Sequence, residues 1–312
     1  MSPASAFPTR RLLEWYARHG RTWLPWRTTR DPYLIVVSEF MLQQTQVERV
    51  IPLYEAFVAR FPSFAALAAA DAADVVRAWR GLGYNSRAMR LHALARAVAE
   101  RHDGTLPDGT DALLALPGIG PYTAAAVRAF AFERDAAALD VNLRRVIHRV
   151  LLGIEYPPLA GARELDALAL GAVASGRAHD WNSALMDLGA TVCTARTPKC
   201  LVCPLRDACA AAPIDPAQLA ARAREHAPAR TPQSVLPFER TTRFLRGRII
   251  DCLRDVPARE AIAFDALRER LAKIVPTDRL HEIPSVVDAL VRDGIVSRVN
   301  TFPQTQLKLS AS

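Results

Sequence analysis

The chain has 312 residues, half of them hydrophobic, and carries a formal net charge of +8 at pH 7. This length can bury a substantial core and predicts two or three domains. No segment has the uninterrupted apolar length of a bilayer span, and the N-terminus lacks the apolar core of a signal peptide, so we expect a cytoplasmic protein without membrane contact. The excess of arginine favours a polyanionic partner such as nucleic acid, although a GC-rich genome produces the same composition.

Helical periodicity dominates from Arg10 to about Ala210. Apolar residues recur there at spacings of three and four, and β-branched alternation is scarce. Short Gly and Pro motifs, such as Asp31-Pro32 and Leu116-Pro117-Gly118, separate the segments. The pattern predicts a compact all-α domain with short connections.

The composition changes after this region. Residues 213–240 are rich in Ala, Pro and Arg and predict a linker. Three amphipathic segments follow, and then two alternating runs separated by a turn, Ile295 to Val299 and Gln306 to Leu309. Three helices and a β-hairpin in this order predict a winged-helix module over 241–312, with a small packing or oligomerisation domain as the alternative.

Four of the five cysteines lie in one run with the spacing C-x6-C-x2-C-x5-C: Cys193, Cys200, Cys203 and Cys209. Thiolates this close can hold one inorganic centre, and we expect a 4Fe–4S cluster. A zinc site usually pairs two C-x2-C knuckles across a longer gap, and a disulfide framework is typical of small secreted domains. Both remain as alternatives, as does a loop in which four free thiols line a cavity.

A glycine-containing turn precedes the helix that is predicted from Ala124 to Phe130. Gly118 and Gly120 permit a tight turn whose free amides point outward at the helix N-terminus, where a phosphate is favoured. Tyr122 and Thr123 complete the turn. A plain connection between helices gives the same pattern. Further along, Asp140 lies between apolar residues just before a new helix, where it can act as an N-cap.

Several motifs in this order resemble the helix-hairpin-helix DNA glycosylases, the superfamily of endonuclease III, and within it most closely the adenine glycosylases of the MutY type. The match runs from Arg21 to about Ala210. The motifs are Leu24-Pro25-Trp26-Arg27, Ser38-Glu39-Phe40-Met41-Leu42-Gln43-Gln44-Thr45, Trp79-Arg80-Gly81-Leu82-Gly83-Tyr84, the glycine turn, Asp140, Met186-Asp187-Leu188-Gly189 and the four cysteines.

The resemblance implies a mainly α, two-lobed fold over 1–212 with an iron–sulfur loop. One six-helix lobe is expected at about 31–138, and a cluster lobe from the N-terminus together with about 139–212. The substrate is expected to be double-stranded DNA with a mismatched or damaged base, which is flipped into a cleft by an enzyme acting as a monomer.

Cleavage of an N-glycosidic bond needs a proton for the leaving base and a charge to stabilise the cationic sugar, and two carboxyl groups in different environments meet both needs. By resemblance, Glu39 protonates the purine and Asp140 stabilises the oxocarbenium ion. Bifunctional relatives carry a lysine at the position of Tyr122. A phenol cannot form a Schiff base, so an efficient lyase step is not expected.

The resemblance also assigns residues to the base pocket and to probing the duplex. These are Trp26, Arg27, Gln43, Gln44, Leu82, Tyr84, Asn142 and Ser183. Ordinary helix and turn packing is the alternative for Leu82 and Tyr84. Ser183 departs from the MutY pattern, where a longer Glu or Gln is typical. MutY-type enzymes also have a C-terminal domain related to Nudix hydrolases, and this chain has the predicted winged helix in its place.

The expected activity is therefore monofunctional removal of a mispaired purine, adenine opposite G or 8-oxoguanine. Two alternatives stay open. One is a mismatch glycosylase for thymine or another damaged base opposite G. The other is a non-catalytic iron–sulfur protein that binds DNA or senses redox state.

Overall fold

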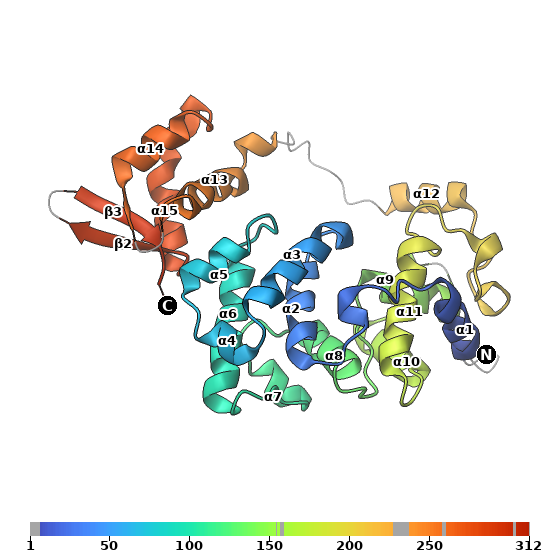
Figure 1. The fold of residues 1–312 in the computed structure, drawn as a ribbon. Coiled ribbons are helices and arrows are strands. Elements are labelled where there is room, and N and C mark those ends of the chain that lie inside the picture. Colours follow the sequence, from blue (N-terminus) through green and yellow to red (C-terminus); the bar gives the residue numbers. More distant parts are fainter. Residues whose placement is uncertain are drawn as a thin grey trace. The chain divides into compact units, whose positions relative to one another are not determined.

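The structure, a computed structural model, describes residues 7–153, 155–156, 159–226, 237–257, 260–301 and 304–311. It is mainly helical, as predicted, and small strands occur only near the C-terminus of the described chain (Figure 1). None of the described helices combines the length and apolar character needed to cross a membrane.

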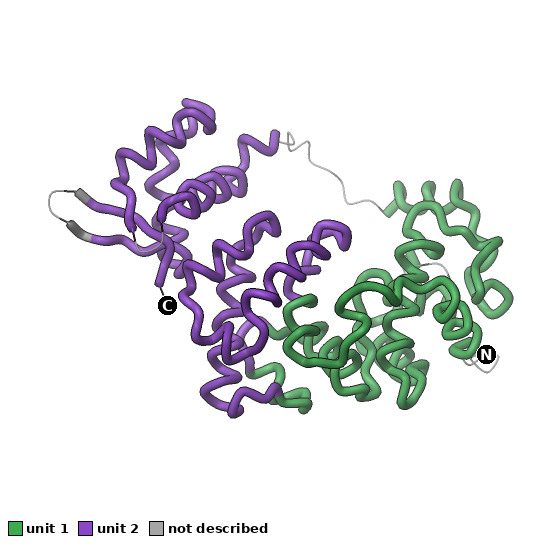
Figure 2. Tube along the Cα trace, viewed as in Figure 1, with its two compact units in different colours: residues 1–39, 107–115, 119–231 green, residues 40–106, 116–118, 232–312 purple. Residues whose placement is uncertain are grey.

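The chain divides into two compact units (Figure 2). Unit 1 comprises Met1–Glu39, Pro107–Ala115 and Ile119–Thr231, and unit 2 comprises Phe40–Leu106, Leu116–Gly118 and Pro232–Ser312. These limits differ from the predicted lobes, because the glycine-turn helix groups with the cluster region and the C-terminal module groups with residues 40–106.

Unit 1 holds the N-terminal and cluster-proximal helices. Its core forms where α1, α9 and α11 pack together through side chains such as Leu12, Leu143 and Trp181. The elements of unit 1 are α1 (Thr9–His19), η1 (Pro25–Arg27), most of α2 (Pro32–Leu42), α7 (Thr110–Leu114), α8 (Pro121–Phe130), α9 (Val141–Ile147), η2 (His148–Leu152), α10 (Ala162–Ala172), α11 (Ala178–Thr191), η3 (Cys200–Val202), η4 (Arg206–Ala208) and α12 (Pro216–Glu225).

Part of the predicted linker is helical, because α12 covers Pro216–Glu225. Residues 227–236 of the predicted linker lie outside the described residues. Asp215 caps the helix by accepting a hydrogen bond from the Ala217 amide at 2.8 Å, and Pro216 occupies its first position. The alanines that resembled a linker favour a helix once it is capped and Leu219 is buried.

Unit 2 contains helices from the first half of the chain and the whole C-terminal module. Its elements are the end of α2, α3 (Val47–Arg60), α4 (Phe64–Ala68), α5 (Ala72–Ala78), α6 (Ser86–Arg101), η5 (Phe238–Arg240), α13 (Thr242–Arg254), β1 (Ile262–Ala263), α14 (Phe264–Ala272), η6 (Thr277–Glu282), α15 (Ile283–Arg292), β2 (Val296–Thr301) and β3 (Gln304–Leu309).

The C-terminal module has the three helices and the hairpin that the sequence predicts, and β1 adds a third strand. The antiparallel order is β1-β3-β2, with Leu307 of β3 opposite both Ile262 and Arg298. Apolar side chains of the three helices and the sheet share one core, which also takes in Val76 of α5. The module is therefore packed onto α5. The winged-helix assignment itself stays a prediction.

Candidate active site and metal centre

Glu39 is a buried acid in a helix that is otherwise almost entirely apolar. Its residue is 7% exposed, and burial raises the pKa of its carboxyl to about 7. The Asp140 charge adds to this rise in pKa, whereas a hydrogen bond from the Tyr122 hydroxyl and the charge of Arg27 oppose it. A substantial fraction of Glu39 therefore holds its proton near neutral pH, as a general acid requires.

Tyr122 lies in the first turn of α8, directly after the N-cap Gly120 and Pro121. The ring packs against a small core that includes Ile35 and Phe130. Burial, followed by the nearby Glu39 and Asp140 charges, raises the pKa of Tyr122 well above its ordinary value. The phenol therefore stays neutral and donates its hydrogen bond to Glu39.

Asp140 is the N-cap of α9, as its sequence position predicts. One carboxylate oxygen accepts hydrogen bonds from the backbone amides of Asn142 at 2.8 Å and Leu143 at 2.7 Å. The other accepts from the Asn142 side-chain amide at 2.9 Å. Charge-assisted bonds of this kind fix the carboxylate in place.

Arg27 is held beside this centre by groups that sequence reasoning did not assign. Its guanidinium donates to the Tyr16 hydroxyl at 2.9 Å and to Asp187 at 3.4 Å. Asp187 is 1% exposed and also accepts three hydrogen bonds from Arg21. The motif around Asp187 is present in the sequence, but the pairing of Asp187 with arginines 160 and 166 residues away is seen only in the structure.

The other predicted pocket residues of unit 1 differ in their surroundings. Trp26 is buried in η1, and Asn142 lies beside Asp140. Ser183 is fully buried in α11, and among the described residues its hydroxyl has no hydrogen-bond partner. Its neighbour Asn182 instead bonds to the backbone of Ala138 and two further residues.

Two segments of unit 2 carry the predicted probing residues. Arg87, which was not predicted as a site residue, connects these segments. This guanidinium is buried and donates to backbone carbonyls at the end of α2 and in the Gly81–Ser86 turn, including those of Gln43 and Leu82. Burial lowers the pKa of Arg87 to about 10. Several carbonyls converging on one cation fix the two segments together.

The exposed side chain of that turn is Tyr84. Its residue is 39% exposed and has a left-handed backbone with φ of 45°, whereas Leu82 is only 5% exposed. Gln44 is also left-handed, with φ of 55°. Of the two turn residues predicted to fill the duplex, Tyr84 is the one that solvent reaches in this structure.

In the glycine turn, Gly118 has a backbone conformation that favours glycine, whereas Gly120 does not. Gly118 has φ of 78°, and a Cβ there would come within 3.0 Å of the Phe40 ring, so a side chain is excluded on both counts. Gly120 has ordinary extended geometry and caps α8, and Thr123 is buried in the helix. Phosphate binding by this turn stays a prediction.

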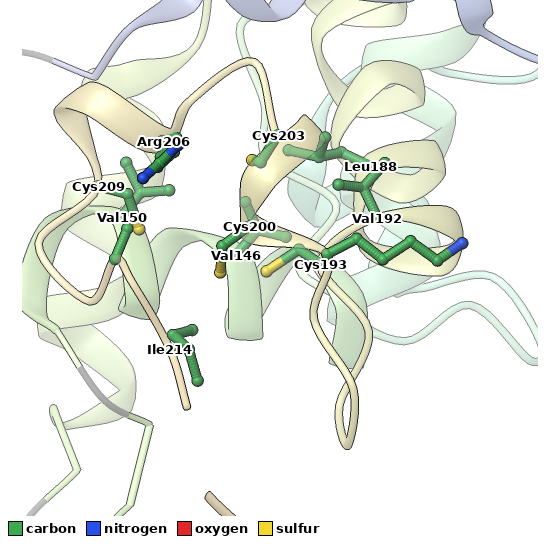
Figure 3. A pocket seen from close by; sticks show the side chains of 12 residues that line it. Val146, Val150, Leu188, Val192, Cys193, Cys200, Cys203, Arg206, Cys209 and Ile214 are labelled. Carbon is green, nitrogen blue, oxygen red and sulfur yellow. The ribbon is translucent and has the colours of Figure 1, made fainter. Parts of the chain in front are cut away.

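The four cysteines of the predicted cluster line one cavity, together with apolar side chains such as Val146 and Leu188 (Figure 3). Burial and the neighbouring thiolates raise the pKa of Cys203 to about 11. Four thiolates in such a place are disfavoured unless a cationic centre holds them. Within the described part of the chain, no three Cys, His, Asp or Glu side chains are arranged to hold a single metal ion.

Two arginines of α9 and η2 connect this loop to the rest of unit 1. Arg145 donates to the Cys193 carbonyl, the Gly189 carbonyl and the Asn142 side chain, each at 2.8 Å. Arg149 is fully buried and donates to the Cys193 sulfur at 3.4 Å. A chain of hydrogen bonds therefore runs from Asp140 through Asn142 and Arg145 to the cluster loop.

A helical body with a glycine turn before α8, a buried acid paired with a phenol, and a four-cysteine loop define a DNA repair protein of the helix-hairpin-helix class. The family model described as the HhH-GPD superfamily base excision DNA repair protein matches residues 37–164. The iron–sulfur binding domain of endonuclease III matches residues 193–209.

Relatives extend the match over most of the chain. An adenine DNA glycosylase of Mycolicibacterium smegmatis is 44% identical over 78% of this chain and 79% of its own length. One of Mycobacterium tuberculosis is 40% identical over 92% of this chain and 89% of its own length. A solved thermostable thymine-DNA glycosylase has a TM-score of 0.60 and 35% identity, covering 64% of this chain and 93% of that one.

The chain belongs to the HhH-GPD superfamily of base excision DNA repair proteins. It is a DNA glycosylase of base excision repair with a 4Fe–4S cluster, and the matched iron–sulfur domain spans all four cysteines from Cys193 to Cys209. A cluster held by these four thiolates would tie the 193–209 loop together.

Proposed function

We propose that this enzyme removes adenine mispaired with guanine or 8-oxoguanine, without an efficient lyase step. The observation that carries the proposal is the buried pair of Glu39, whose pKa is about 7, and neutral Tyr122, beside the fixed carboxylate of Asp140. The 44% and 40% identity to proteins named adenine DNA glycosylase supports adenine as the base.

The reaction divides between the two carboxyl groups. Glu39 donates its proton to a ring nitrogen of the extruded purine, so that the base departs neutral and its glycosidic electron pair goes with it. Asp140 remains ionised and stabilises the positive charge that develops on the sugar. Water then adds at the anomeric carbon and gives a proton to the Glu39 carboxylate, which restores the acid. Tyr122 orients the Glu39 carboxyl, and it has no amine to attack the sugar.

Double-stranded DNA is the proposed partner, and we propose that one copy of the chain acts on it in the cytoplasm, beside the chromosome. The glycine turn of Gly118 and Gly120 supports binding of a backbone phosphate at the N-terminus of α8. Trp26, Arg27, Asn142 and Ser183 are the proposed pocket residues on the same unit. Gln43, Gln44, Leu82 and Tyr84 are the proposed probing residues of unit 2.

A thymine glycosylase is the second candidate, and Ser183 favours it. A buried serine lacks the reach of Glu or Gln, and a thymine-DNA glycosylase is among the solved structures that resemble this chain. Both candidates predict base release, which a purely binding or sensing protein would not give.

The test is single-turnover base release from a panel of duplexes that differ in one pair: A opposite 8-oxoguanine, A opposite G, T opposite G, and matched controls. We expect release of adenine from the first two and an intact backbone until alkali is added. If thymine is released faster than adenine, thymine is the substrate. If no base is released, the protein binds DNA without cleaving the glycosidic bond.

A further inference from the structure

A groove of about 530 Å³ lies entirely within unit 2, between the Gly81–Ser86 turn and the start of α13. We call it the turn groove. Its two walls are held together by Arg254 of α13, which donates to the Val76 carbonyl at 2.9 Å and to the Asn85 side chain at 2.7 Å. The C-terminal module and the turn with Tyr84 therefore form one surface.

The turn groove is strongly cationic. Its lining residues include one carboxylate, Asp251, and five arginines, namely Arg49, Arg243, Arg246, Arg248 and Arg254. Asp251 pairs with Arg248 and Arg254, and Arg246 pairs with Asp293. Arg49 and Arg243 form no ion pair with any residue that the structure describes.

Aromatic rings lie beside one of these two arginines, Arg243. The Arg243 guanidinium carbon is 4.2 Å from the centroid of the Tyr84 ring and 6.0 Å from that of Phe238. Tyr84 is 39% exposed and Phe238 is 54% exposed. Unpaired guanidinium groups next to exposed flat rings match a nucleic acid strand, which offers phosphates and stacking faces together.

We propose that the turn groove binds the sugar-phosphate backbone of one strand of duplex DNA, with phosphate oxygens on Arg49 and Arg243. The proposal rests on the proposed function, because it adds a contact surface to an enzyme that acts on DNA. Arg243 also holds the ring of Tyr84, so the C-terminal module sets the orientation of the exposed aromatic in the turn. The module thus supplies binding and positioning rather than chemistry.

The experiment compares Arg49→Gln and Arg243→Gln with Arg268→Gln in the full-length protein that holds its cluster. Arg268 is an exposed arginine of α14 that does not line the groove, so its variant removes the same charge from the module that also carries Arg243. Affinity for a fluorescent duplex is measured by anisotropy from 50 to 300 mM salt. Thermal unfolding and cluster absorbance report folding of each variant.

Each groove variant should bind roughly ten-fold more weakly at 150 mM salt, and the slope of log affinity against log salt should become shallower by about 1. Arg268→Gln should match the wild type in both measures. Arg243→Lys keeps the charge and should recover the salt slope.

Equal losses in all three Gln variants would show a general charge effect and overturn the proposal, as would wild-type affinity in both groove variants. An oligo-glutamate peptide that binds the wild type but not Arg243→Gln, without any change in duplex affinity, would make the groove a docking site for a protein and also overturn it. Base release by the wild type is assayed in parallel. Its absence would sink the proposed function, whereas normal release with unchanged affinities would sink the groove alone.

Discussion

The proposed chemistry depends most on one glutamate in an apolar helix. In α2, Glu39 follows a run of buried side chains that includes Ile35, Val36 and Val37, so the chain brings the acid into a medium of low polarity. Burial dominates the rise in its pKa, and Tyr122 and Arg27 limit that rise. The balance leaves the proton both present and transferable near neutral pH.

The rate of base release should follow the protonated fraction of Glu39. Since that carboxyl has a pKa of about 7, the single-turnover rate should be level below pH 7 and fall about ten-fold per unit above it. Glu39→Gln should be slower by roughly 10²–10⁴-fold and should lose this dependence. A variant that keeps the wild-type rate and profile would exclude Glu39 as the acid.

The same substitution should stabilise the fold at alkaline pH. A carboxyl with a pKa of 4.5 when unfolded and about 7 when folded loses up to about 3 kcal/mol of folding free energy as pH rises between those values. Glu39→Gln removes this loss. Denaturant unfolding should show the variant gaining stability over the wild type at pH 8 and little at pH 5, and a gap that does not change with pH would contradict the assigned pKa.

Tyr122→Lys should create a trappable covalent adduct. The substitution puts an amine where the bifunctional relatives carry theirs, and its uncharged form can attack the anomeric carbon of the sugar. The measurement is borohydride trapping on lesion duplex in a denaturing gel. Tyr122→Phe is the matched control, since it loses the hydroxyl without gaining an amine, and trapping by the wild type would remove the monofunctional assignment.

At the scale of the element, α9 joins a structural task to a proposed catalytic one. Asp140 caps the helix, and Asn142 and Arg145 then carry hydrogen bonds on to the Cys193 carbonyl of the cluster loop. The carboxylate that we propose stabilises the sugar cation is thus fixed by the same bonds that begin the helix. Substitutions of Asp140 can therefore test its capping role and its proposed catalytic role separately.

Asp140→Asn should abolish base release while it preserves the fold. Asparagine is as good an N-cap as aspartate, so the bonds to the Asn142 and Leu143 amides can persist while the negative charge is lost. Single-turnover release and lesion-duplex affinity should be measured together. Asp140→Ala should lose about 1 kcal/mol of stability as well, and normal release by the Asn variant would exclude the charge from the mechanism.

At the scale of the whole molecule, the C-terminal module is packed on the glycosylase helices and not merely tethered to them. Val76 of α5 belongs to the core of the module, and Ala73 and Met89 pack against it. Only the tertiary structure reveals this, because the sequence between α12 and the module has the composition of a linker. Removing the module should therefore expose an apolar face.

Val76→Thr should have different effects in two chain lengths. In the full chain it puts a hydroxyl into a site that is 1% exposed, and should cost about 1–3 kcal/mol of unfolding free energy. In a chain ending at His226 the site faces water, and the same change should cost almost nothing and improve solubility. Thermal unfolding and light scattering of the four proteins test this, and equal costs in both lengths would show that the module does not cover Val76.

Much of the local structure could be predicted from the sequence. The helices of the C-terminal module, the hairpin after them, the helix that carries Asp140 as its cap, and the left-handed Gly118 all follow from periodicity and turn chemistry within a few residues. The linker prediction was wrong at α12, because capping by Asp215 and burial of Leu219 outweigh a low-complexity composition.

The sequence by itself determined which groups are present: Glu39, Tyr122, Asp140 and the spacing of four cysteines, all of which resemblance and local pattern identify. The tertiary structure alone decided their environments. The pKa of Glu39, the bonds of Arg21 and Arg27 to Asp187, the carbonyls around Arg87 and the cationic turn groove each depend on groups far apart in the chain. Periodicity reports which face of an element is apolar, whereas desolvation and long-range ion pairing arise only when those faces meet.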